Sequence, residues 1–124
     1  MPDPDRVVYR VKDRVATVTL SRPSKLNAMD RQTFAELRRA AARAAEDPEV
    51  GAVVVTGAGR AFSSGLDLAE FSNMAQVDDG EEVVGELQRA ISAFELLPKP
   101  VIAAVNGLAV VDLRHVGELG QVEP

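Results

Sequence analysis

Residues 51–71, "GAVVVTGAGRAFSSGLDLAEF", contain the clearest structural pattern in the chain. The short, continuous run of β-branched residues near its start is typical of a buried strand that is covered on both faces. Small residues follow, and then "LAEF", which favours a short helix. Strand, small-residue loop and helix in this order indicate an α/β protein, in which such loops often carry the chemistry.

The preceding residues predict a hairpin, a helix and a crossover. Residues 6–23, "RVVYRVKDRVATVTLSRP", predict two strands around a turn at residues 12–14, because Ala16, Val18 and Leu20 alternate with more polar neighbours. "SKLNAM" is expected to be a loop. Asp30 is a candidate N-cap for a helix over residues 31–47, whose inward stripe would be Phe34, Leu37, Ala41 and Ala44. A helix between two strands implies a parallel pair.

The following residues repeat this pattern of helix, buried strand and loop. "QVDDGEE", residues 76–82, is expected to be a polar, mobile connection, and residues 81–97 predict an amphipathic helix. Its apolar face would carry Val84, Leu87, Ile91 and Phe94. "PKPVIAAVNGLAV" predicts a second buried strand over residues 101–105 and a loop at Asn106–Gly107. The predicted fold class is therefore α/β.

Composition narrows the possible functions. A chain of 124 residues forms one domain at most, and 46% apolar with 27% charged residues is typical of a globular protein. The net charge of −5 argues against a nucleic-acid partner. The absence of cysteine excludes disulfides and thiol nucleophiles. Without a long apolar run or a secretory signal, we expect a cytoplasmic protein with no membrane partner.

Three conventional kinds of functional site have candidate residues in this chain. A nucleotide-phosphate loop fails on spacing, because Phe62 stands where a dinucleotide fingerprint needs its third glycine, and no Gly-Lys-Ser/Thr follows. Acid–base catalysis by carboxylates is less favoured, since Asp67 is better placed to cap the following helix. The remaining candidates are Glu70 and a group on the solvated face of the later helix: Glu81, Glu82, Glu86 and Glu95. The lone His115 makes a poor metal site, and none is predicted.

The backbone offers a fourth interpretation. A strand that turns through small residues into a helix leaves first-turn N–H groups without helical partners, and these can hold an oxyanion. Ser63, Ser64 and Gly65 would admit a substrate carbonyl that bulky side chains would block. From the residues alone, a tight turn with no catalytic role is the favoured interpretation.

Three stretches in series carry a resemblance to a known family. "VATVTLSRPSKLNAM", "VVVTGAGRAFSSGLDLAEF" and "LPKPVIAAVNGLAV" are similar, in order and spacing, to the enoyl-CoA hydratase/isomerase (crotonase) family over residues 7–110. The resemblance implies an α/β spiral of β-β-α units that binds acyl-CoA or enoyl-CoA. It also implies hydration or isomerisation through an enolate held by two backbone N–H groups. CoA is then part of the substrate, and no separate cofactor is expected.

Matched by position, the resemblance makes the N–H of Leu66 the first oxyanion donor. It places the CoA-binding wall at two loops, which comprise Lys25, Leu26, Asn27, Ala28, Ser63, Ser64, Gly65, Asp67 and Leu68. We hypothesise that Lys25 or Arg60 holds the phosphates, because each is a cationic residue beside this loop in an acidic protein.

The resemblance ends at residue 110. The family's second donor lies in a glycine run at positions where this chain has Val111, Asp112 and Leu113, and a family glutamate falls at His115. A second glutamate would lie beyond the chain. Residues 1–110 are thus interpreted as the N-terminal part of a crotonase-like domain and residues 111–124 as a divergent tail, as truncation or a frameshift would produce.

We therefore expect an incomplete crotonase-like member with weak or no hydratase activity. It would expose apolar surface and tend to associate, whereas a complete member would form a homo-oligomer, a trimer or hexamer. The alternative is a non-catalytic acyl-CoA-binding or assembly fragment.

Overall fold

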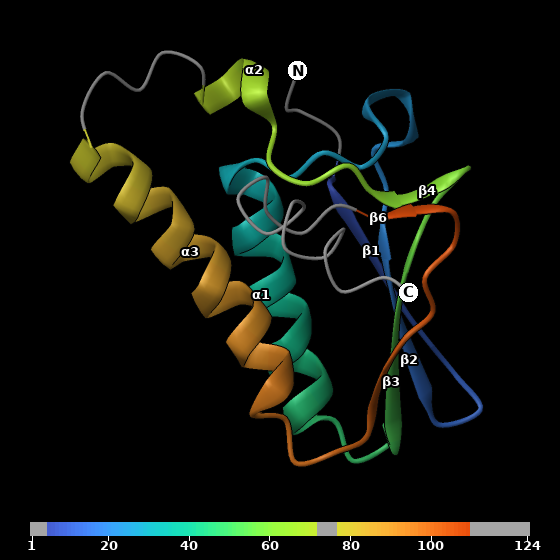
Figure 1. Cartoon of the computed structure of the whole chain (residues 1–124). Helices are drawn as coiled ribbons and strands as arrows, with labels where there is room; N and C mark the ends of the chain where they lie inside the picture. Colours follow the sequence, from blue (N-terminus) through green and yellow to red (C-terminus); the bar gives the residue numbers. More distant parts are fainter. Residues whose placement is uncertain (1–4, 72–76, 110–124) are drawn as a thin grey trace, which may run out of the picture.

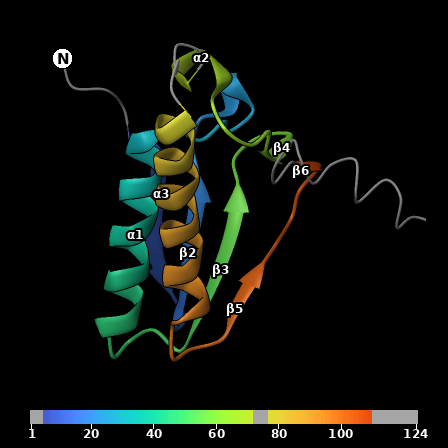
Figure 2. The ribbon, with the colours of Figure 1, turned by 60° about the vertical axis from the view of Figure 1, so that its left-hand side comes forward.

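In the computed structural model, two long helices lie side by side against one face of a twisted sheet (Figures 1 and 2). The structure describes residues 5–71 and 77–109, with side chains for 5–71 and 81–109. The main sheet has the order β1-β2-β3-β5, and β4 and β6 form a separate two-stranded sheet beyond its end.

The predicted hairpin is confirmed. β1 (Val7–Lys12) pairs antiparallel with β2 (Val15–Leu20), from Val7 opposite Leu20 to Lys12 opposite Val15. Asp13 and Arg14 both adopt positive φ, 51° and 67°, as the tight two-residue turn of a hairpin requires. Alternate residues of β2 are buried, as their period-two pattern predicts.

α1 (Arg31–Glu46) begins and ends where the sequence indicates. The Asp30 carboxylate accepts a hydrogen bond from the Thr33 N–H at 2.9 Å, and the Thr33 hydroxyl accepts one from the Asp30 N–H at 3.2 Å. This capping box satisfies two backbone donors at the start of the helix. β3 (Ala52–Gly57) then runs parallel to β2, which confirms the predicted crossover.

The second half has shorter strands. β3 leads into β4 (Ala61–Ser63), α2 (Leu68–Phe71) and α3 (Val77–Glu95), and then β5 (Val101–Ala103) and β6 (Leu108–Ala109). β5 pairs parallel with β3, and β6 pairs parallel with β4. A 3-10 turn, η1 (Pro23–Lys25), occupies the start of the segment predicted as the "SKLNAM" loop. The short strand β4 also lies in a segment that the sequence indicated as a loop.

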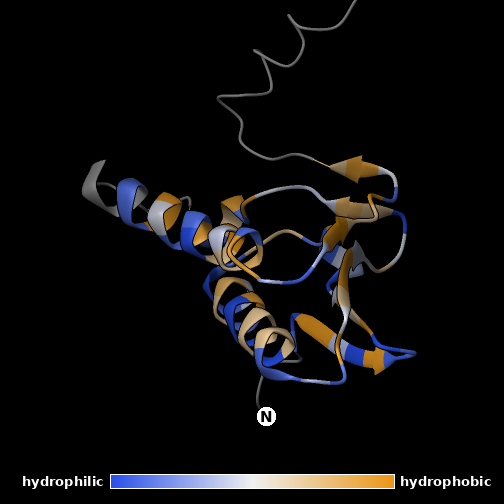
Figure 3. Ribbon diagram, turned by 90° about the horizontal axis from the view of Figure 1, so that it is seen from below, coloured by the Kyte–Doolittle hydropathy of each residue, from blue (hydrophilic) through white to orange (hydrophobic). Residues whose placement is uncertain are grey.

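The core lies between the sheet and the two long helices. Figure 3 shows apolar and polar residues alternating along both long helices. The sheet, α1 and α3 each contribute to the buried cluster: Ala16, Val18, Leu20 and Val53 from the strands, Phe34, Leu37, Ala40, Ala41 and Ala44 from α1, and Val83, Leu87 and Ala90 from α3. The predicted inward stripe of α1 is confirmed.

Two predictions about the strands are wrong. β3 is not covered on both faces: Val53 is fully buried, while Val54 and Val55 are half-buried, because the long helices cover one face only. The strand predicted over residues 101–105 ends at Ala103 and is largely exposed, with Ile102 at 56% and Val105 at 54%. Among the described residues β5 is the last strand of the sheet, so only β3 lies beside it.

The prediction for α3 needs two corrections. The helix begins at Val77, so most of the segment predicted as a polar, mobile connection is helical. Its buried face is also rotated slightly from the predicted one, since Val83 and Ala90 are buried, whereas Val84 is half-buried and Ile91 is 43% exposed. Packing against α1 selects these residues, which periodicity alone did not distinguish.

The expected exposure of apolar surface is confirmed around β5 and β6, where Ile102, Val105 and Leu108 are each about half exposed or more. In the part of the chain that the structure describes, no helix has the length and apolarity to cross a membrane. The cytoplasmic location stays a prediction.

Gly57 gives a test of the fold. A Cβ at this position would lie 2.5 Å from the carbonyl oxygens of both Ala61 and Phe62, so Gly57→Ala forces the β3–β4 turn apart. We expect a loss of at least about 2 kcal/mol in the free energy of unfolding, measured by urea titration. Gly51→Ala is the control, because its Cβ would meet nothing closer than 3.6 Å. Equal stability of the two variants would contradict this packing.

Candidate functional site

Two loops that are far apart in the sequence are joined by backbone hydrogen bonds. The Met29 N–H donates to the Gly65 carbonyl at 2.7 Å, and the Asp67 N–H donates to the Met29 carbonyl at 2.8 Å. These bonds form an isolated parallel bridge between Met29 and Leu66. A third bond, from the Ser64 N–H to the Leu26 carbonyl at 2.9 Å, extends the contact. The structure thus brings together the two loops that the sequence indicated.

The Leu66 N–H takes no part in the hydrogen bonds between the two loops. Within residues 5–71 and 77–109 it has no hydrogen-bond acceptor, although the N–H groups of Ser64, Gly65 and Asp67 all have one. The carbonyl of Gly65 and the N–H of Leu66 belong to one trans peptide, so they point in opposite directions. Because the carbonyl points at Met29, the Leu66 N–H points away from Met29.

Ser63 and Gly65 shape the backbone before this donor. The Ser63 hydroxyl is buried, donates to the Asn27 carbonyl at 2.9 Å and accepts from the Gly65 N–H at 3.0 Å. Gly65 has φ of 98°, a conformation that glycine adopts without strain. These two residues therefore fix the turn that presents Leu66.

Asn27 has a structural side chain. It is 1% exposed, donates to the carbonyls of Ala58 and Ala61 at 2.9 and 2.8 Å, and accepts from the Arg22 N–H at 2.7 Å. Its φ of 56° is left-handed, which asparagine tolerates better than most residues. Both ends of the side-chain amide are used, and the backbone N–H of Asn27 also donates to the Arg22 carbonyl at 2.9 Å.

Arg22 lies at the centre of an ion-pair network that the sequence analysis missed. Its Nη1 donates to the Asp67 carboxylate at 2.8 Å and to the Ala28 carbonyl at 3.2 Å. The same nitrogen is 3.7 Å from Asp30, which also accepts from Arg6 Nε at 3.0 Å. The sequence around Arg22, which directly precedes Pro23, gives no sign of this role, because no local pattern relates Arg22 to a carboxylate 45 residues away.

Asp67 caps α2, as predicted, and its charge is held by Arg22. Its Oδ1 accepts from the N–H groups of Ala69 and Glu70 at 3.0 and 3.3 Å. The Arg22 hydrogen bond is the main cause that lowers the pKa of Asp67 below 3.8. For Asp30, burial acts to raise the pKa, but hydrogen bonds from Thr33 and Arg6 outweigh it and leave the pKa lowered. Both carboxylates are therefore charged at neutral pH.

Asp30, Asp67 and Glu70 place carboxylate oxygens within 4.8 Å of one another, which resembles a cation site. The guanidinium of Arg22 contacts the first two, and Arg6 also contacts Asp30. Positive charge is thus already supplied by arginine, and we assign no metal to this cluster.

The other predicted residues vary in exposure. Lys25, Arg60 and Leu68 are exposed, and Leu26 and Ala28 are half-buried beside Asn27. Glu81, Glu82 and Glu95 are on a solvated helix face as predicted, while Glu86 is half-buried and pairs with Arg31 at 3.1 Å. Val111, Asp112, Leu113 and His115 lie outside the described residues.

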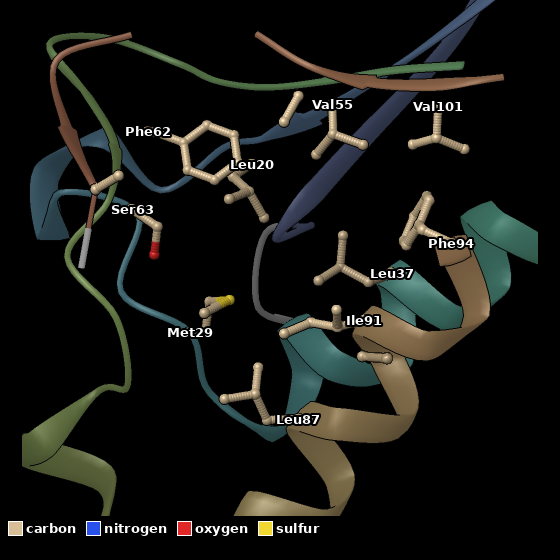
Figure 4. Close-up of a pocket in the computed structure, with 13 residues that line it drawn as sticks. Leu20, Met29, Leu37, Val55, Phe62, Ser63, Leu87, Ile91, Phe94 and Val101 are labelled. Atoms are coloured by element: carbon tan, nitrogen blue, oxygen red, sulfur yellow. The ribbon is translucent and has the colours of Figure 1, made fainter. Parts of the chain in front are cut away.

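An apolar pocket of about 280 Å³ lies between α3 and the strands (Figure 4). Leu87, Ile91 and Phe94 of α3 face Val55 and Val101 of the sheet across it. Of the described residues that line it, Ser63 alone is polar, and its hydroxyl is already bonded to Asn27. The described walls of the pocket therefore suit an apolar group. The sequence did not reveal this pocket, because its walls come from seven separate helices and strands.

Comparison with known proteins relates these loops to one family. The model of the family described as enoyl-CoA hydratase/isomerase matches residues 10–111. Over 108 residues the chain is 37% identical to the short-chain-enoyl-CoA hydratase of Clostridium acetobutylicum, and over 110 residues it is 34% identical to a mitochondrial Delta(3,5)-Delta(2,4)-dienoyl-CoA isomerase of Mus musculus. These matches cover 86% and 81% of this chain, but 41% and 34% of the relatives.

Solved structures give the same result for the fold. An enoyl-CoA hydratase/isomerase of Xanthobacter autotrophicus is 38% identical with a TM-score of 0.77, over 82% of this chain and 39% of that one. A Legionella pneumophila protein assigned to the enoyl CoA hydratase/isomerase (crotonase) group is 32% identical with a TM-score of 0.78, over 85% and 41%. The predicted α/β, crotonase-like fold is confirmed, and the chain spans about two fifths of the relatives it matches.

The lowered pKa of Asp67 predicts a pH dependence of stability. A carboxyl group whose pKa is lower in the folded state stabilises the fold above its unfolded pKa, and this contribution is lost as pH falls through the folded value. We expect the free energy of unfolding to fall below pH 3.8, and to fall less in Asp67→Asn, which has no group to protonate at that position. Urea titrations at pH 6 to about pH 2 measure both.

Glu95→Gln is the matched control, since it removes one exposed negative charge from α3 without touching the network. If Asp67→Asn and Glu95→Gln show the same acid dependence as the wild type, Asp67 does not carry the effect.

Proposed function

The chain belongs to the enoyl-CoA hydratase/isomerase family, and from this premise we propose that its Leu66 loop binds an acyl-CoA thioester and polarises the thioester carbonyl. The observation that carries the proposal is the Leu66 N–H, which lacks an acceptor in the described structure while its neighbours are all bonded. A polar group is rarely left unpaired without a reason, and the N–H of a half-buried residue such as Leu66 is suited to a ligand oxygen.

The chemistry follows from where negative charge develops. Attack on, or proton removal next to, an enoyl thioester places charge on the carbonyl oxygen, and a fixed N–H donor stabilises that charge by about 3 kcal/mol. For the whole protein we propose hydration, a lyase reaction, or isomerisation of an enoyl-CoA. The described residues supply one donor of the proposed oxyanion hole, and the positions predicted for the second, at 111–113, lie outside them.

The proposed CoA-binding wall is formed by Lys25, Leu26, Asn27 and Ala28 on one loop and the segment 63–68 on the other. Lys25 and Arg60 support a phosphate contact, because both are exposed and lie on neighbouring turns: a Cβ on Gly59 would be 3.1 Å from the Cβ of Pro23. Two exposed cations on neighbouring turns of an acidic protein favour an anionic group such as a nucleotide phosphate.

The oxyanion proposal is tested with Leu66→Pro, which deletes the donor but breaks no hydrogen bond within the described structure. Crotonyl-CoA carrying a ¹³C label at the thioester carbonyl is bound to the protein, and its carbonyl stretch is measured by infrared difference spectroscopy. We expect the wild type to lower the stretching frequency and Leu66→Pro to abolish the shift. Leu66→Ala, which keeps the N–H but loses the same apolar contacts, should retain it.

A folded Leu66→Pro variant with an unchanged shift would contradict the assignment. Hydration of crotonyl-CoA, assayed beside CoA binding, separates the two functions that the sequence left open. Turnover above a heat-treated control excludes a non-catalytic fragment, and loss of one donor should then lower kcat about 10² to 10³-fold. Binding without turnover favours the acyl-CoA-binding alternative.

We further propose that copies of the chain associate through β5 and its surroundings. Ile102, at the edge of the sheet, is 56% exposed, and an edge strand with apolar side chains is a template for pairing with another chain. Ile102→Lys should lower the sedimentation coefficient at high concentration toward that of a monomer. Val11→Lys, a change at another exposed apolar residue on β1, should not. The reverse pattern would place the contact at β1.

A further inference from the structure

We propose that Arg22 is a positioning residue for the Leu66 N–H, which it fixes and polarises through two peptide groups in series. The inference rests on the proposed function of Leu66, and it assigns to Arg22 a role beyond a stabilising ion pair. The relay begins at the guanidinium, passes through the Ala28–Met29 and Gly65–Leu66 peptides, and ends at the proposed oxyanion donor.

The hydrogen bonds of the relay follow one another without a gap. Arg22 Nη1 donates to the Ala28 carbonyl at 3.2 Å. In the same peptide, the Met29 N–H points the opposite way and donates to the Gly65 carbonyl at 2.7 Å. In the next peptide, the Leu66 N–H again points the opposite way and has no acceptor among the described residues. The donor proposed to meet the substrate is thus the free end of a chain that starts at a positive charge.

Such a chain does more than hold the loop still. Hydrogen bonds in series polarise one another, and a charged donor at one end strengthens the donor at the other. An oxyanion at Leu66 would complete the series, with the Arg22 charge behind it. The arrangement therefore favours the charged state of the substrate carbonyl over the neutral one, as transition-state stabilisation requires.

Asp67 anchors the guanidinium in this orientation. One nitrogen of Arg22 carries two hydrogens, and its two closest acceptors are the Ala28 carbonyl and the Asp67 carboxylate. The Arg22 and Asp67 side chains are 19% and 12% exposed, so water screens the pair only weakly. Asp30 does not depend on Arg22 in the same way, because Arg6 lies closer to it, at 3.0 Å against 3.7 Å.

Amide hydrogen exchange tests the positioning without any ligand. Arg22→Met keeps the length of the side chain but removes the charge and the donors. We expect exchange of the Met29 and Asp67 amides to accelerate at least about tenfold, while amides of β2 and β3 keep their protection. Arg39→Met, a change at an exposed arginine of α1, should leave all of them unchanged. Arg22→Lys provides a second variant that retains the charge if Arg22→Met does not fold.

The labelled crotonyl-CoA described above tests the polarisation. We expect Arg22→Met to lose most of the carbonyl shift, while the Kd for free CoA, which has no thioester carbonyl, changes less than about threefold. Asp67→Asn, which weakens the anchor but leaves the Arg22–Ala28 bond possible, should lose less of the shift than Arg22→Met. Arg22→Lys, a point charge without the planar fork, should recover part of it.

Three results would overturn the proposal. Faster exchange spread evenly over β2, β3 and the loops would make Arg22 a general stabiliser of the fold. Unchanged exchange at Met29 and Asp67 in folded Arg22→Met would show that the relay is not held by Arg22. An equal carbonyl shift in wild type and Arg22→Met would exclude polarisation. A wild type that binds crotonyl-CoA without any shift would instead refute the role of Leu66, and the exchange data would still decide whether Arg22 positions the loop.

Discussion

Two hydrogen bonds between Met29 and the residues on either side of Leu66 join the loop after β2 to the loop after β4. Pairing of this kind leaves the middle residue with its own N–H and carbonyl directed away from the partner. The proposed site therefore arises from backbone geometry: no reactive side chain is needed, and small residues at 63–65 are enough to expose the donor. Everything else in the site either maintains this pairing or lies next to it.

The carboxylates around this pairing also accept hydrogen bonds from backbone N–H groups at the ends of helices and strands. Asp30 caps α1, Asp67 caps α2, and the buried carboxylate of Glu36 accepts from the N–H groups of Arg6 and Val7 at the start of β1. Burying a carboxylate is costly unless it is paired and hydrogen-bonded. Here each of these carboxylates accepts hydrogen bonds from backbone N–H groups that would otherwise lack a partner. These bonds offset the cost of removing the charge from water.

Local patterns account for most of the fold and for the identity of the loops, and they fail where tertiary packing decides. The hairpin and α1 were predictable because period-two alternation and the Asp30 cap are encoded within a few residues. The buried face of α3 was not, because contact with α1 selects Val83 and Ala90 over Val84 and Ile91. Arg22 and the apolar pocket were missed for a related reason, since partners from distant elements define both. The proposed role of Leu66 came from family resemblance, because the residues alone favoured a simple tight turn.

The turn between β3 and β4 explains how the exposed second half stays attached to the site. Asn27 donates to the carbonyls of Ala58 and Ala61 from one side of this turn. From the other side, Asn106 donates to the carbonyl of Gly57 at 2.8 Å and accepts from its N–H at 3.0 Å. The β5–β6 connection is thus fixed to the turn by paired amides, although Val105 and Leu108 beside Asn106 bury little apolar surface. Directional hydrogen bonds can set the position of a segment that burial stabilises only weakly. The side-chain amide of Asn27, which holds the turn, also accepts a hydrogen bond from the Arg22 N–H at the start of the first loop. Because Asn27 and Asn106 both bond to residues 57–61, this turn connects the β5–β6 segment to the first loop of the proposed site.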